Sequence, residues 1–200
     1  MKNQVVKIGL LGAHRTGKTT LAKEFSKRME IPFIPVSISS LQAEIGYNSA
    51  KQDYSFDDRI KIQDHLLTRV VEITNGTQGS SIFDRCTLDL VGYASLAITD
   101  HLSVEQGDWF KQYVTDCVAA ANETLNLVTL LQPGIPLTDC ATSANSCNGL
   151  IHALNLTYLG LLNHGELYIG HMKMPAEFTY LELRMQLMIS TYNRLQGNNP

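Results

Sequence analysis

The sequence predicts an α/β domain, a three-layer sandwich in which a five-stranded parallel sheet carries helices on both faces. Short apolar runs with the length of strands alternate along the chain with segments that have helical spacing, as in doubly wound sheets. The first run, residues 5–11, is almost wholly apolar, as expected for a strand buried on both faces. A glycine-rich loop joins that run to an amphipathic segment. We therefore expect ligands at the carboxyl ends of the strands.

The expected elements follow one another without a linker or an internal repeat. Strands are predicted at residues 5–11, 31–36, 81–83, 126–131 and 166–170. Helices are predicted at residues 18–29, 55–73, 87–97, 103–121, 148–162 and 176–195, with a short helix after residue 36 and a polar loop at 138–148. Ser55 and Ser103 are expected N-caps, because a serine hydroxyl can accept a hydrogen bond from a free helix N–H.

Length and composition fit a single globular domain over residues 1–200. Of the 200 residues, 44% are hydrophobic and 18% are charged, which shows no bias toward disorder. No apolar stretch reaches the roughly 18–20 residues that cross a bilayer. The four cysteines lack metal-ligand spacing, which predicts reduced thiols that behave as small hydrophobes. We expect a cytoplasmic protein without a membrane partner.

Residues 12–19, GAHRTGKT, have the spacing of a phosphate-binding P-loop. Its glycines allow backbone N–H groups to turn toward phosphate oxygens, while Lys18 reaches the β- and γ-phosphates and the Thr19 hydroxyl binds magnesium. The motif predicts binding of ATP with Mg²⁺. The expected contacts of the donor nucleotide are Gly12, Ala13, His14, Arg15, Thr16, Gly17, Lys18, Thr19 and Thr20.

Asp84 and Arg85 follow the apolar end of the third expected strand. A carboxylate in that place can join Thr19 at the magnesium ion or order its water, although Asp84 is also a candidate cap of the next helix. The guanidinium of Arg85 can clamp a phosphate with two hydrogen bonds, and a surface salt bridge is its alternative. The pair therefore predicts a second part of the same site.

Charge is distributed unevenly along the chain. Residues 1–29 carry seven Lys or Arg side chains and one Glu, whereas the whole chain has a net charge of −3. Between Lys111 and Lys173 there is no Lys or Arg. A broad surface for duplex nucleic acid needs many basic side chains, so a small anionic ligand near the loop fits the sequence better.

Three segments, GAHRTGKTTLA, FDRCTLDLVGYA and SFDDRIKIQDHLL, resemble the AAA-type ATPase and kinase family that includes ribosylnicotinamide kinases. They are similar, more distantly, to thymidylate kinases, whose Asp-Arg motif binds the acceptor phosphate. The resemblance covers most of the chain in element order, and its specific parts are the loop and the Asp-Arg segment. It implies a P-loop NTPase fold and phosphoryl transfer from ATP, with the acceptor phosphate at Arg85.

Two departures from that family bear on mechanism. The expected lid, residues 138–148, contains no arginine, and Arg15 stands where some thymidylate kinases carry a catalytic arginine within the loop. Residues 35–39 contain no carboxylate to serve as a general base, which favours an anionic nucleoside monophosphate as acceptor. Glu44, His14 and Asp89 remain alternative bases. Gln63 lies in a segment that in related deoxynucleoside kinases presents an amide to the edge of the nucleobase, and Asp89 and Tyr93 are expected to line the acceptor pocket. For all three, the alternative is a structural role, as an exposed polar residue or a capped aromatic side chain.

The leading hypothesis is a small-molecule kinase, most of all a (deoxy)nucleoside monophosphate kinase. Its expected catalytic residues are Lys18, Arg15, Arg85 and Asp84, and its metal ligands Thr19 and Asp84. The alternatives are a regulatory NTPase without a small acceptor, a nicotinamide riboside or nucleoside kinase, and a kinase of a modified base in DNA. The sequence leaves the oligomeric state open, a homodimer included.

Overall fold

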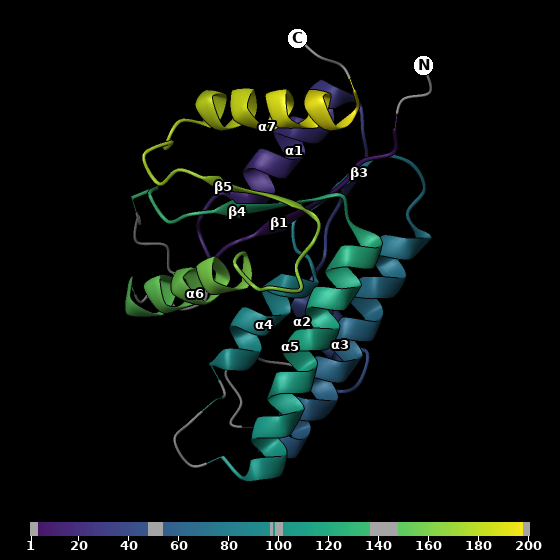
Figure 1. The fold of residues 1–200 in the computed structure, drawn as a ribbon, viewed down its shortest axis with the longest axis vertical. Helices are drawn as coiled ribbons and strands as arrows, with labels where there is room; N and C mark the ends of the chain where they lie inside the picture. Colours follow the sequence, from purple (N-terminus) through teal and green to yellow (C-terminus); the bar gives the residue numbers. More distant parts are fainter. Residues whose placement is uncertain (1–3, 48–53, 97, 99–101, 137–147, 198–200) are drawn as a thin grey trace.

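The computed structural model describes residues 4–47, 54–96, 98, 102–136 and 148–197. Five parallel strands form one sheet in the order β2-β3-β1-β4-β5 (Figure 1). The strands are β1 (Lys7–Leu11), β2 (Phe33–Ile34), β3 (Ser81–Phe83), β4 (Leu127–Leu131) and β5 (Gly170–Met174). The predicted five-stranded parallel sheet is confirmed, with β1 in its centre.

Helices cover both faces of the sheet, which confirms the predicted three layers (Figure 1). The helices are α1 (Lys18–Met29), α2 (Ile38–Ala43), α3 (Phe56–Gly76), α4 (Thr87–Ser95), α5 (Val104–Thr124), α6 (Asn148–Leu161) and α7 (Leu181–Leu195). On one face lie α1 and α7, and on the other lie α4, α5 and α6, with α3 packed outside α4 and α5. Both predicted serine caps are confirmed: Ser55 accepts a hydrogen bond from the backbone N–H of Asp58, and Ser103 from that of Gln106.

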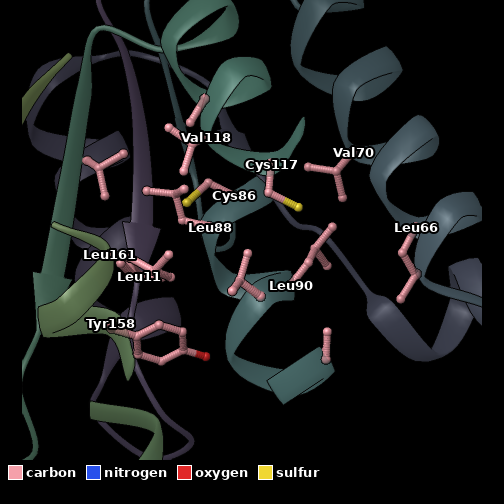
Figure 2. Packing of buried hydrophobic residues seen from close by; sticks show 14 of the residues in the cluster. Leu11, Leu66, Val70, Cys86, Leu88, Leu90, Cys117, Val118, Tyr158 and Leu161 are labelled. Carbon is pink, nitrogen blue, oxygen red and sulfur yellow. The ribbon is translucent and has the colours of Figure 1, made fainter. Parts of the chain in front are cut away.

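Each face of the sheet carries its own apolar core. Side chains alternate along β1, so that Ile8 and Leu10 pack under α1 and α7 whereas Leu11 faces the opposite layer. Figure 2 shows this second core, in which Cys86 and Cys117 lie among leucines and valines. Both thiols are free and buried, as expected of small hydrophobes. Cys140 and Cys147 lie outside the described residues.

The structure differs from the predicted boundaries mainly in the last third of the chain. The fifth strand was expected at residues 166–170 but begins at Gly170. The reason is the side chain of Asn122, which donates to the carbonyl of Glu166 at 2.7 Å and accepts from the N–H of Tyr168 at 2.9 Å. These bonds take up backbone groups that strand pairing would otherwise use.

The last helix begins at Leu181, five residues later than expected. A turn precedes it, in which the N–H of Phe178 bonds to the carbonyl of Pro175. The second strand is two residues long, shorter than predicted. Most of the polar loop at 138–148 lies outside the described residues. Within the described part of the chain, no helix has the length and apolar character needed to cross a bilayer.

Candidate nucleotide-binding site

The loop of residues 12–17 connects β1 to α1 at the carboxyl edge of the sheet. Gly12 has a φ of 149° and Gly17 a φ of 86°, both in the region that side chains disfavour. A Cβ atom at Gly12 would also lie 2.7 Å from the carbonyl oxygen of Leu131. Both glycines are therefore required by the shape of the loop. Arg15 also has a positive φ, 63°, which costs backbone energy in a non-glycine residue.

Lys18 is folded back onto the loop. Its Nζ donates to the carbonyl oxygens of Gly12 at 2.6 Å and Ala13 at 2.9 Å, and the residue is 8% exposed. Burial lowers the pKa of this amine to about 8, against an ordinary value of 10.5, and Asp89 and Asp84 oppose that shift. The ammonium group is thus a desolvated cation that gains by meeting an anion.

Thr19 and Asp84 lie together, as the magnesium hypothesis requires. The hydroxyl of Thr19 donates to Oδ2 of Asp84 at 3.2 Å, and the backbone N–H of Val36 donates to Oδ1 at 2.9 Å. Asp84 does not cap α4, whose N-cap residue is Cys86. A hydroxyl and a carboxylate are oxygen ligands of the kind that Mg²⁺ binds, so this pair fits the ion.

Arg85 belongs to a connected cluster with three other side chains. Its Nη1 forms an ion pair with Oδ2 of Asp89, and its guanidinium lies 5.5 Å from the ring centroid of Tyr93. The Tyr93 hydroxyl lies 3.0 Å from Nε2 of His14. Arg85 thus forms a salt bridge, as its alternative role required, but a largely buried one, since Asp89 is fully buried and Arg85 is 18% exposed.

Burial, with Arg85 and Lys18 nearby, lowers the pKa of His14. The imidazole is therefore neutral at pH 7. Burial raises the pKa of Tyr93 to about 12, which keeps its hydroxyl protonated. The His14–Tyr93 contact is then a hydrogen bond between neutral groups and adds no charge to the site.

A cavity of about 270 Å³ lies against the loop. It is lined by His14, Arg15, Gly17, Lys18, Thr19, Thr20, Asp84 and Arg85. All eight are predicted site residues. Three of them are cations and one is a carboxylate, so the cavity suits an anion. Of the other predicted loop contacts, Gly12, Ala13 and Thr16 are buried behind it.

Of the predicted acceptor residues, Arg85 lines this cavity, whereas Gln63, Asp89 and Tyr93 do not. Asp89 and Tyr93 both contact Arg85. Gln63 lies on α3, where its Oε1 accepts from the hydroxyl of Tyr113 on α5 at 2.9 Å. Its contact with the nucleobase of an acceptor remains a prediction.

Sequence reasoning missed Arg184, which holds the loop from outside the cavity. Its Nη1 donates to the carbonyl oxygen of Thr16 at 2.6 Å, and the residue is 2% exposed. A signal was present in the sequence. Arg184 shares the buried side of α7 with Met185 and Met188, and a charged residue on an apolar helix face is unusual.

Comparison with known proteins agrees with this geometry. Deoxyadenosine kinase from M. mycoides has a TM-score of 0.64 at 14% identity, with 94% of this chain and all of that chain covered. NadR has a TM-score of 0.65 at 18% identity, covering 98% of this chain and 51% of NadR. Thymidylate kinase from Candida albicans has a TM-score of 0.60 at 15% identity, covering 97% and 94%. These likenesses show that the fold is that of P-loop kinases.

No curated protein matches the chain in sequence. A sequence profile described as an AAA domain, however, matches residues 7–142. That range includes the loop, the Thr19–Asp84 pair and the Arg85 cluster. Since it spans more than half of the 200 residues, the chain belongs to the AAA domain family.

Proposed function

We propose that this protein transfers the γ-phosphoryl group of ATP, with Mg²⁺, to a nucleoside or nucleotide, and that the acceptor is a (deoxy)nucleoside monophosphate. The observation that carries the proposal is the cavity itself. It brings the phosphate loop, the Thr19–Asp84 pair and Arg85 together at the carboxyl edge of a parallel sheet. In such a site catalysis consists mainly of positioning and charge stabilisation.

On the donor side, three residues have distinct roles. Lys18 would leave the loop carbonyls for the β- and γ-phosphates, which compensates its buried charge. Thr19 and Asp84 would hold Mg²⁺, which supplies charge neutralisation on the phosphates. Thr19 and Asp84 already lie together, whereas Lys18 would exchange its two carbonyl partners for phosphate oxygens.

Arg15 is the proposed catalytic arginine. Its side chain lines the cavity and forms no hydrogen bond or ion pair with any described residue. The guanidinium is therefore free to meet the charge that develops during in-line transfer. An arginine in this role can contribute about 10³-fold or more to turnover.

On the acceptor side, the described carboxylates that could act as a base are already engaged. Asp84 accepts from Thr19 and Val36, and Asp89 pairs with Arg85. Glu44 pairs with Arg69, and it does not line the cavity. A phosphomonoester is already anionic and needs no base, whereas a neutral hydroxyl acceptor benefits from one. The engaged carboxylates support a monophosphate held by Arg85, and His14, which lines the cavity with its Nε2 3.0 Å from the Tyr93 hydroxyl, is the remaining alternative base.

The test is an acceptor panel with ATP and Mg²⁺, in which ADP formation is measured. The panel contains deoxynucleoside monophosphates, deoxynucleosides, nicotinamide riboside, single-stranded DNA and no acceptor. We expect ADP formation that depends on a monophosphate. Hydrolysis of ATP at the same rate with every acceptor and with none would overturn the kinase proposal in favour of a regulatory NTPase. Phosphorylation of a nucleoside but not of a monophosphate would overturn the assignment of a monophosphate as the acceptor.

Arg15→Ala tests the catalytic arginine within the same assay. We expect a fall in kcat of about 100-fold or more, with ATP affinity within about threefold of wild type, because the charge acts in the transition state. Arg15→Gly is the matched variant, since glycine accepts the positive φ without strain. Unchanged turnover in both variants would refute the assigned role.

A further inference from the structure

Arg184 is a buried cation whose hydrogen bonds join two distant parts of the chain. Its Nε donates to the carbonyl oxygen of Phe178, just before α7, and its Nη1 donates to that of Thr16 in the phosphate loop. Its Nη2 is buried and has no hydrogen-bond partner among the described residues. Within the same residues it forms no ion pair. A desolvated charge without a counter-ion is costly.

The bond to Thr16 determines which way the next peptide N–H points. A trans peptide is planar, so the Thr16 carbonyl and the Gly17 N–H lie on opposite sides of the same unit. Thr16 is 1% exposed and its carbonyl faces Arg184, whereas Gly17 lines the cavity. The arginine therefore turns the Gly17 N–H away from itself and toward the cavity.

The fit behind Gly17 is tight, which limits other orientations of this peptide. A Cβ atom at Gly17 would lie 3.1 Å from Nη1 of Arg184 and 3.0 Å from Cδ1 of Ile135. Arg184 and Ile135 thus form the wall behind the loop. Since backbone N–H groups that converge on one cavity bind phosphate, the orientation has a chemical consequence.

We propose that Arg184 is a positioning residue for the nucleotide phosphates: it holds the Thr16–Gly17 peptide so that the Gly17 N–H donates to a phosphate, whose charge compensates the unpaired guanidinium. The inference rests on the proposed function, since it needs a phosphate in the cavity. Burial also lowers the pKa of Arg184, in agreement with a cation that lacks a partner.

The experiment measures binding of ADP and of inorganic tripolyphosphate, each with Mg²⁺, by isothermal titration calorimetry. Arg184→Met removes both hydrogen bonds and the charge. Arg184→Lys keeps the charge but cannot donate to both carbonyls through a planar fork. Arg194→Met is the matched control, since Arg194 is exposed on the same helix and its removal changes the net charge equally.

We expect the Kd for ADP and for tripolyphosphate to rise about tenfold or more in Arg184→Met, and less in Arg184→Lys, with no change in Arg194→Met. Wild-type affinity in a folded Arg184→Met protein would overturn the inference. If that variant does not fold, wild-type affinity in Arg184→Lys would overturn it. Weaker ADP binding with unchanged tripolyphosphate binding would also overturn it, because the role concerns phosphate.

The two proposals fail in different ways. A wild-type chain that binds neither ADP nor tripolyphosphate would overturn the proposed function and this inference together. A wild-type chain that binds both, with variants that bind equally well, would overturn this inference alone.

Discussion

Replacing Lys18 by methionine is expected to stabilise the nucleotide-free protein at pH 7 while it removes phosphoryl transfer. The amine is desolvated behind the cavity, and its pKa falls from 10.5 to about 8 on folding. Methionine has similar length and no charge, so it removes the cost of desolvation. The proposed function of the loop depends on that costly charge, and stability and activity should therefore move in opposite directions.

The magnitude follows from proton linkage. Below pH 8 the lysine is charged in both the folded and the unfolded chain, and the folded state carries the full cost, about 3 kcal/mol at about 1.36 kcal/mol per pKa unit. Between pH 8 and 10.5 the folded chain has lost the proton that the unfolded chain still binds, so the cost declines, to below about 1 kcal/mol at pH 10. Loss of the two hydrogen bonds to the loop carbonyls opposes the gain by roughly 1 kcal/mol each at any pH.

Urea unfolding at pH 7 and at pH 10, without nucleotide, measures the pH-dependent cost of desolvation and the pH-independent loss of the two hydrogen bonds. The free energy of unfolding of Lys18→Met minus that of wild type should fall by about 2–3 kcal/mol between the two pH values. Lys27→Met, exposed on the same helix, is the control and should show no such change. A difference for Lys18→Met that does not depend on pH would refute the reasoning.

Three further substitutions test the metal pair and the packing of glycines in helices. Asp84→Asn keeps an oxygen for the Val36 N–H but loses the charge beside Thr19, and should raise the Mg²⁺ concentration for half-maximal activity at least tenfold, measured by titration of the assay. An unchanged Mg²⁺ requirement would remove Asp84 from the metal site. Gly92→Ala would place Cβ 2.3 Å from the Tyr158 ring and should lower the free energy of unfolding by about 1–3 kcal/mol in urea. Gly107→Ala, in open space on α5, should raise it by about 0.5–1 kcal/mol, and equal effects at the two glycines would contradict the packing argument.

The fold could be predicted where local patterns and tertiary structure agree. β1 is buried on both faces because it is the central strand of a sheet that helices cover on each side, and this is what its apolar composition indicated. The fifth strand was misplaced because the apolar residues 167–169 resemble a strand. Their backbone is instead bound by the side chain of Asn122, a contact 44 or more residues distant that no local pattern shows.

The site was predictable to the extent that it follows the loop and the end of β3. The spacing of the loop and the end of the third strand identified the eight residues that line the cavity, because parallel strands end at a common edge. It could not show that Arg85 is already paired with Asp89, or that Gln63 faces Tyr113. These partners are set by the packing of α3, α4 and α5. A charged residue on an apolar helix face marks Arg184 in the sequence, but its bond to Thr16, 168 residues away, is set by the tertiary fold.

The central place of β1 has a consequence for the order in which the chain folds. β1 precedes both of its partners, and it is complete in the sheet only after β3 and then β4 have been synthesised. Pairings between strands this distant in sequence form slowly, because the entropy of closing the loop is lost before the favourable contacts are made. On a ribosome the phosphate loop would therefore emerge before β3 and β4, and it would take its final shape only after both strands have paired with β1. Until α7 follows, the guanidinium that fixes its backbone is not yet present.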